Sequence, residues 1–185
     1  MRFNTHSRLT GAHSLLSPSK YHWVNYDEDK MVTYMTSHLA AQRGTELHDL
    51  AAKLIRLGVK LPDTGATLNQ YVNDAIGFRM TAEQTLYYSE NCFGTADAIS
   101  FRDGLLRVHD LKTGVTPASI TQLVVYAAMF CLEYNYNPNS IAIELRIYQN
   151  DDVVTHIPTP VEVILIMEKI VSFDKLIRKI REEGE

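Results

Sequence analysis

The stretch from residue 93 to residue 112, FGTADAISFRDGLLRVHDLK, constrains the fold more than any other part of the chain. Apolar runs lie on both sides of Asp103-Gly104. An Asp-Gly pair between such runs is the strongest short-range signal for a β-hairpin. The sequence therefore predicts two antiparallel strands joined by a tight turn at Arg102-Asp103-Gly104.

Charged side chains lie late in both strands of this predicted hairpin. Asp97 belongs to GTAD, and Asp110 and Lys112 belong to HDLK. Because side chains alternate across a strand, we expect Asp110 and Lys112 to share a face with Leu106 and Val108. If Asp97 lies opposite Asp110, the two carboxylates converge, and such oxygen clusters bind hard cations. Taken alone, however, an Asp-x-Lys tripeptide is more often a solvated surface pair.

The patterns around the hairpin predict an α/β fold. Residues 28–58 predict a helix, in one piece or in two that meet near Arg43-Gly44, with leucines and an alanine on its apolar stripe: Leu47, Leu50, Ala51, Leu54 and Leu57. Further helices are expected over 67–78, from Thr116-Pro117 to about Tyr134, and from Pro160 onward. Further strands are expected over 83–88, 140–148 and 153–157, with Asn150-Asp151-Asp152 as the turn between the last two. The order ααβββαββα indicates a mixed β-sheet flanked by helices.

Composition narrows the class of protein. A chain of 185 residues with 45% hydrophobic and 22% charged residues is typical of one soluble domain, which we expect to span residues 1–185. No apolar run reaches the roughly 18 residues of a membrane span, so we expect no membrane partner. No disulfide is suggested, so a reducing cytoplasm is the expected location. The two cysteines, Cys92 and Cys131, are too few for a four-cysteine zinc or iron–sulfur site. A net charge of −4 disfavours general binding of polyanions by a basic surface.

The motifs exclude several kinds of catalysis. The sequence contains no GxSxG, no Walker loop, no GxGxxG and no HExxH. Carboxylates, one lysine and a helical histidine remain, and this set suits metal-assisted hydrolysis of a phosphoester. Asp97 and Asp110 would hold the metal, with the Leu111 main-chain carbonyl as an extra ligand. Lys112 would orient or deprotonate a water or stabilise charge at phosphorus.

The N-terminal arm over residues 1–26 carries a basic and aromatic patch. Ser17-Pro18-Ser19 is expected to cap and begin a short helix. Lys20, Tyr21 and Trp23 follow it. Two interpretations stay open here: the aromatic rings pack on the core, or they stack on a nucleobase while Lys20 binds a phosphate.

Four motifs in one order resemble the PD-(D/E)xK nuclease superfamily. They are G-x-x-x-H at 44–48, G-T-x-D at 94–97, D-x-K-T-G at 110–114 and Q-x-x-x-Y at 122–126. The chain looks most like the RecB-like and Cas4-like branch, which includes small phage-type exonucleases, and the resemblance covers roughly residues 43–135. It implies a restriction-endonuclease-like core in a bacterial or phage-infected cell.

The resemblance also implies roles for individual residues. It places His48 with Asp97 and Asp110 on one or two Mg²⁺ or Mn²⁺ ions and makes Lys112 catalytic. Supporting positions are expected at Gln122, Tyr126, Glu83 and Glu46, with Glu83 as a further metal or second-layer acid. Because the chain lacks four cysteines, we expect no iron–sulfur cluster.

Three functions follow as hypotheses. The first is a metal-dependent DNA nuclease, an exonuclease serving recombination, repair or phage DNA processing. Its partners would be DNA, a helicase or recombination protein for unwinding, and further copies of itself. The second is a catalytically silent module of the same fold that binds DNA ends or a partner. The third is a hydrolase of a small phosphorylated molecule.

Overall fold

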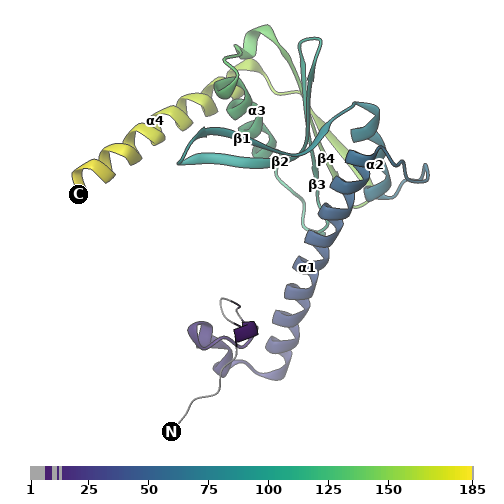
Figure 1. The fold of residues 1–185 in the computed structure, drawn as a ribbon, viewed down its shortest axis with the longest axis vertical. Helices are drawn as coiled ribbons and strands as arrows, with labels where there is room; N and C mark the ends of the chain where they lie inside the picture. The colour runs from purple at the N-terminus through teal and green to yellow at the C-terminus, as the bar shows by residue number, and fades with distance from the viewer. Residues whose placement is uncertain (1–6, 10–11, 13, 185) are drawn as a thin grey trace. The chain divides into compact units, whose positions relative to one another are not determined.

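The computed structural model describes residues 7–9, 12 and 14–184 (Figure 1). The chain divides into two compact units, Met1–Gln42 and Arg43–Glu185. All strands of the described chain, and the whole span 43–135 that carries the nuclease-like motifs, belong to the second unit. The single domain expected over residues 1–185 stays a prediction.

The first unit contains two short 3₁₀ helices, η1 (Ser7–Leu9) and η2 (Pro18–Asn25), and the beginning of α1 (Glu28–Leu57). Ser17 precedes η2 but makes no capping hydrogen bond, because its hydroxyl lies 2.8 Å from that of Ser19. The expected capped helix is therefore an uncapped 3₁₀ segment. α1 is one helix, so the alternative of two pieces is wrong.

The second unit carries a five-stranded sheet in the order β1-β2-β3-β4-β5. Neighbouring strands are antiparallel, except that β3 and β4 are parallel and are joined through α3. The elements after α1 are α2 (Thr67–Gly77), β1 (Thr81–Ser89), β2 (Cys92–Arg102), β3 (Leu105–Leu111), α3 (Thr121–Glu133), η3 (Pro138–Ser140), β4 (Ala142–Gln149), β5 (Asp152–His156) and α4 (Pro160–Gly184). The mixed sheet and the order of the helices and strands agree with the sequence-based prediction.

Both predicted strand turns are present. Asp103 and Gly104 have φ of 51° and 75°, and Asn150 and Asp151 have φ of 53° and 58°. Two successive residues with positive φ are typical of the type I′ turn, whose twist matches that of the paired strands. Asx and glycine residues accept this backbone conformation most readily, which is why these turns were visible in the sequence.

The start of α3 differs from the prediction. Thr116 and Pro117 lie in a loop, and the helix begins at Thr121. Gln149, at the end of β4, holds this loop: its side-chain oxygen accepts from the Ala118 N–H at 3.1 Å and its amide donates to the Thr116 carbonyl at 2.8 Å. These long-range bonds satisfy the backbone groups that an earlier helix start would have used.

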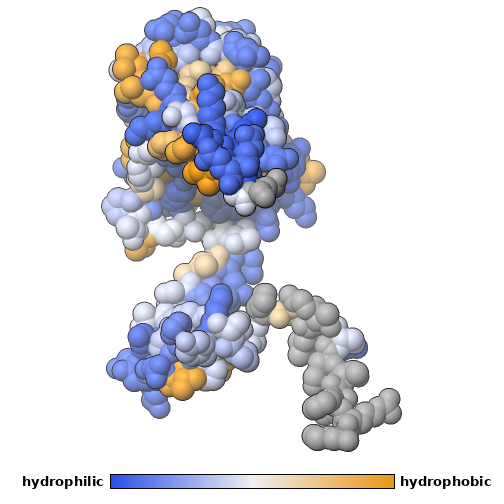
Figure 2. Space-filling view, turned by 90° about the vertical axis from the view of Figure 1, so that its left-hand side faces the viewer, coloured by the Kyte–Doolittle hydropathy of each residue, from blue (hydrophilic) through white to orange (hydrophobic). Residues whose placement is uncertain are grey.

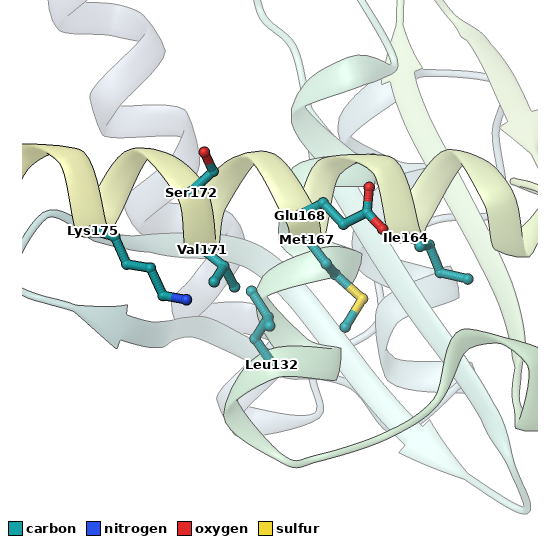
Figure 3. A pocket seen from close by; sticks show the side chains of 7 residues that line it. All are labelled: Leu132, Ile164, Met167, Glu168, Val171, Ser172 and Lys175. Atoms are coloured by element: carbon teal, nitrogen blue, oxygen red, sulfur yellow. The ribbon is translucent and has the colours of Figure 1, made fainter.

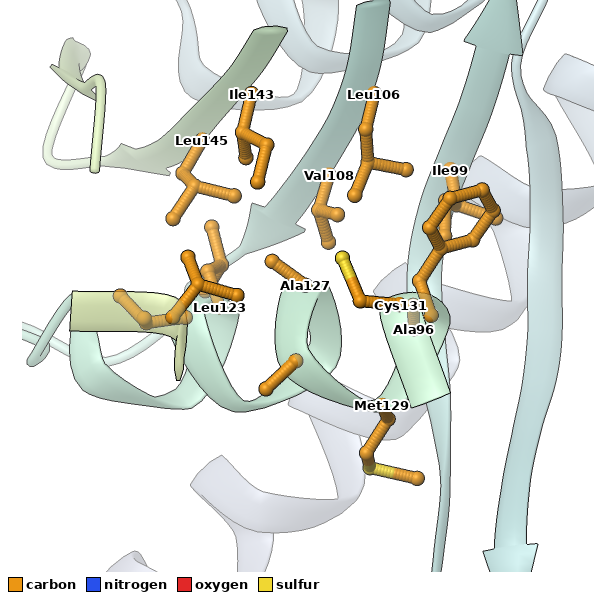
Figure 4. Packing of buried hydrophobic residues seen from close by; sticks show 14 of the residues in the cluster. Ala96, Ile99, Leu106, Val108, Leu123, Ala127, Met129, Cys131, Ile143 and Leu145 are labelled. Carbon is orange, nitrogen blue, oxygen red and sulfur yellow. The ribbon is translucent and has the colours of Figure 1, made fainter. Parts of the chain in front are cut away.

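Two buried apolar clusters hold the sheet. The first packs the sheet against α3 and α4, as Figure 4 shows, with Leu106, Val108, Leu123, Ala127 and Leu145 among its members. The second packs α1 and α2 on the sheet through Ala51, Ala52, Ile55, Tyr71, Val72 and Leu111. β3 is thus covered on both faces, as a central strand requires.

α4 ties the tip of the β1–β2 hairpin to the rest of the second unit. Its Asp174 is only 5% exposed and accepts from the Ser89 hydroxyl at 2.6 Å and from the Asn91 amide at 2.8 Å. Arg178 lies 2.9 Å from the same carboxylate. These three donors satisfy a buried charge that would otherwise be costly.

The remaining surface of α4 is partly apolar. A pocket of about 610 Å³ is lined by α4 residues and Leu132 of α3 (Figure 3), and it contains none of the predicted site residues. On the face in Figure 2, hydrophobic residues form separate groups among hydrophilic ones. Among the described helices, none combines the length and apolarity that crossing a membrane requires.

Replacing Leu106 with alanine should destabilise the fold by about 2–5 kcal/mol, because it opens a cavity beside α3. Leu106 is 0% exposed. Urea unfolding followed by circular dichroism measures the change. Val154→Ala serves as the control, since Val154 is 54% exposed and should change stability by about 0.5 kcal/mol or less.

Candidate metal centre

The site lies at a fork in the sheet, the place where the paired strands β2 and β3 separate. β2 pairs with β1 from Ile99 to Cys92, but it pairs with β3 only over Ala98–Arg102. At Asp97 the two strands separate, and the Leu111 N–H donates to Asp97 Oδ2 at 2.9 Å. The Asp97 carboxylate therefore accepts a hydrogen bond that a backbone carbonyl of a paired strand would otherwise accept. This bond fixes Asp97 at the position where β2 and β3 separate.

Three side chains meet at this fork. His48, Glu83 and Asp97 each offer one ligand atom, and these atoms lie within 4.8 Å of one another. His48 Nδ1 is 3.3 Å from Asp97 Oδ2. An imidazole and two carboxylates at this spacing could hold a metal ion, although the donor set alone does not identify which one.

α1 brings His48 to the fork through a close contact one turn earlier. Gly44 is buried, and a Cβ built on it would lie 2.8 Å from Thr113 Oγ1. A larger residue would require either the Thr113 side chain or the helix to move. The glycine of G-x-x-x-H thus has a packing role, and it places the histidine beside Asp97.

Glu83 reaches the group through an unusual backbone. It has φ of 56° and is the one described non-glycine residue with positive φ inside a strand. It lies between the paired residues Gln84 and Ala82, opposite Asp97. Such strained residues occur preferentially at functional sites. Sequence patterns indicated Glu83 only weakly, because a helical or strand pattern does not reveal a single reversed φ.

Asp110 and Lys112 lie next to this group. Asp110 is 3% exposed, and Lys112 Nζ is 3.1 Å from its Oδ1 and 3.0 Å from its Oδ2. Lys112 also donates to Gln122 Oε1 at 3.1 Å. Asp110 Oδ2 lies within ion-pair distance of Lys112 but accepts no aligned hydrogen bond from any described residue, so it can still offer a lone pair to another cation. Asp110 is outside the three-residue group, and its role as a metal ligand stays a prediction.

The carboxylates repel one another. Burial, and then the charge of Asp97, raise the pKa of Asp110 to about 6, although Lys112 opposes the shift. Burial and Asp97 also raise the pKa of Glu83, and the hydrogen bond to Asp97 raises the pKa of His48. A divalent cation would relieve this crowding, because it favours the ionised carboxylates.

α3 supports the fork from the other side. Tyr126 donates its hydroxyl hydrogen to the Thr95 carbonyl at 2.6 Å. A Cβ on Gly94 would lie 3.3 Å from the Tyr126 ring, so only glycine leaves this ring its ordinary space. Gln122 and Tyr126, one helical turn apart, therefore contact Lys112 and the strand that carries Asp97. The glycine of GTAD was the sequence signal for this contact.

Other predicted residues lie elsewhere. Glu46 is exposed and outside the group, and the Leu111 carbonyl as a ligand stays a prediction. In the first unit, Tyr21 is 61% exposed, while Trp23 Nε1 donates to the Ser17 carbonyl at 3.1 Å. Packing of these rings on the core stays an open interpretation. Contact of these rings and of Lys20 with DNA stays a prediction.

Comparison of the sequence with models of protein families and with curated proteins gave no match. The likeness to PD-(D/E)xK nucleases therefore depends on the four motifs and on the contacts that join them. The restriction-endonuclease-like fold stays a prediction within the observed mixed α/β architecture.

Asp97→Asn and Glu83→Gln should each weaken binding of Mn²⁺ by tenfold or more, because each removes an anionic ligand. Electron paramagnetic resonance of free Mn²⁺ gives the affinity. Asp103→Asn is the matched control, since it removes an exposed carboxylate from the hairpin turn. Equal affinities for all three variants would contradict the assigned group.

In the metal-free protein, ionising Asp110 should cost stability. Its folded-state pKa of about 6 lies above the ordinary pKa of an aspartate, 3.8, so the native state holds this proton more tightly than the unfolded chain does. The resulting stabilisation is present below about pH 4 and is lost as the pH rises through 6. Relative to Asp110→Asn, wild type should lose up to about 3 kcal/mol over this interval.

Urea unfolding in EDTA at pH 4, 5, 6 and 7 measures this difference. A gap between wild type and Asp110→Asn that stays constant across the series would show that Asp110 titrates as an ordinary carboxylate.

Proposed function

We propose that the chain is a metal-dependent DNA nuclease that hydrolyses phosphodiester bonds and acts as an exonuclease in recombination, repair or phage DNA processing. The observation that carries this proposal is that two sets of residues meet at Asp97. His48, Glu83 and Asp97 form the cation group, and the Leu111 N–H bound to Asp97 lies between Asp110 and Lys112 in sequence. The set combines carboxylates, an imidazole and an ammonium around one strand fork.

Mg²⁺ or Mn²⁺ suits the donor set. Carboxylate oxygens bind both ions, and the imidazole nitrogen is better tolerated by Mn²⁺. When bound, such an ion supplies positive charge for the phosphate and lowers the pKa of water. It would also offset the negative field of Asp97, Asp110 and Glu83, which would otherwise repel a polyanion.

Lys112 is the residue best placed to act on substrate. An ammonium has three N–H donors. Asp110 and Gln122 each accept from Lys112 Nζ, at 3.1 Å in both cases, which leaves a donor for a phosphate oxygen or a water molecule. Because its two protein partners come from β3 and α3, the ammonium is held in one position. A fixed charge stabilises a developing negative charge without reorganisation during the reaction.

Asp110 and Tyr126 would position rather than react. Asp110 holds Lys112 in place through their ion pair. Tyr126 joins α3 to the Thr95 carbonyl, two residues before Asp97. Both contacts fix the position of Lys112 relative to Asp97. A displacement of about 1 Å at such a site can lower the reaction rate roughly 100-fold.

Lys112→Ala and Asp110→Asn should each lower the rate of DNA cleavage by about 100-fold or more. The first variant removes the positioned ammonium, and the second removes the negative charge that holds it in place. The assay follows end-labelled linear DNA beside a closed circle in Mn²⁺, which also separates exonuclease from endonuclease action. Lys175→Ala is the control, since this exposed lysine lines the α3–α4 pocket and should leave the rate unchanged.

Circular dichroism and urea unfolding must show that the inactive variants are folded. Unchanged cleavage by both variants would reject the proposal. Binding of DNA by wild type without products in Mn²⁺ over hours would replace it with the silent binding module.

A further inference from the structure

One face of the β1–β2 hairpin leads away from the cation group. Gly94 lies against the Tyr126 ring, and Ala96 is buried in the cluster that contains α3. Since side chains alternate along a strand, Phe93, Thr95 and Asp97 point away from α3. Asp97 is accordingly in contact with His48 of α1.

Paired side chains continue along this face. Thr85 and Thr95 lie opposite each other in the register, with their hydroxyl oxygens 3.1 Å apart. The next outward-facing pair is Tyr87 and Phe93. These two rings are 50% and 63% exposed. Asp97 lies four positions after Phe93, which corresponds to about 13 Å along a strand.

Two arginines lie where this row of side chains ends. A polar pocket of about 370 Å³ is lined by Tyr87 with Glu90, Asn91, Arg178 and Arg181. Arg178 is fixed by its ion pair with Asp174, yet its side chain is still 60% exposed. The aromatic pair therefore has guanidinium groups on the side away from Asp97.

We propose that this face binds single-stranded DNA on its way to or from the metal centre. Unpaired bases would stack on Tyr87 and Phe93, and a backbone phosphate would contact Arg178 or Arg181. The inference deepens the proposed function and rests on it. Aromatic rings combined with basic side chains are the general means of binding single strands, because every base has a face that can stack.

The geometry favours a nucleic acid strand over a protein strand. A protein would add to the sheet through the free edge of β1, but the Tyr87 N–H on that edge already donates to Glu133 at 2.8 Å. A base needs the ring faces and leaves the edge alone. At about 3.4 Å per stacked nucleotide, the roughly 13 Å between Phe93 and Asp97 spans about four nucleotides.

The test compares two substrate lengths in Mn²⁺. Tyr87→Ala/Phe93→Ala should lower kcat/KM about 100-fold on a single-stranded 12-mer, mainly through KM, because truncating each of the two stacking rings weakens binding of one base roughly tenfold. A dinucleotide is too short to reach the rings, so its kcat/KM should not change. Val154→Ala, at the opposite edge of the sheet, should alter neither value.

Two single variants separate stacking from apolar contact. Phe93→Trp should retain the affinity for the 12-mer, whereas Phe93→Leu should lose it although it keeps an apolar side chain. Arg181→Gln should reduce the slope of log affinity against log salt by about 0.7, the value for one phosphate of a single strand.

The outcomes are distinct from those for the proposed function. Equal losses on the dinucleotide and the 12-mer, no loss on either, or a preference of the rings for duplex would each overturn the inference. If wild type cleaves neither substrate, the proposed function fails. Fluorescence anisotropy of a labelled 12-mer still decides whether the rings bind DNA, with weaker binding by the double variant supporting the inference and equal binding overturning it.

Discussion

The hydrogen bond from the Leu111 N–H to Asp97 Oδ2 is the contact on which the site depends. It ends the pairing of β2 with β3 while it still satisfies a buried backbone donor. Without it, either the strands would continue to pair and bury Asp97 between them, or the donor would lose its partner at a cost of about 1–3 kcal/mol. The carboxylate thus performs two tasks, since it terminates a ladder and offers its remaining lone pairs to a cation.

The groups that form the site lower the local stability of the fold. Asp110 is buried beside another carboxylate, which raises its pKa to about 6, and Glu83 holds a backbone conformation that non-glycine residues avoid. The clusters on both faces of β3 compensate, because they fix the strand on which Asp110 and Lys112 lie. A strained and charged centre supported by a well-packed sheet is typical of functional sites.

The sequence predicted local geometry well and long-range geometry poorly. The turns at Asp103-Gly104 and Asn150-Asp151, and the shared face of Asp110 and Lys112, follow from backbone preferences and a period of two. The stripe predicted for α1 was partly wrong: Leu47, Leu50 and Leu57 are exposed, and Ala52 and Ile55 are buried in their place. Helical periodicity alone cannot decide which of two overlapping stripes faces the sheet.

Two further features depended on residues far apart in sequence. The late start of α3 follows from Gln149, about thirty positions downstream, and the place of Glu83 follows from the fork at Asp97. A further long-range contact affects the order in which parts of the fold can form during synthesis. The side chains of Ser89 and Asn91 both donate to Asp174, which lies 85 and 83 positions downstream. The hairpin that carries Glu83 and Asp97 therefore reaches its final anchorage only after the ribosome has released most of α4.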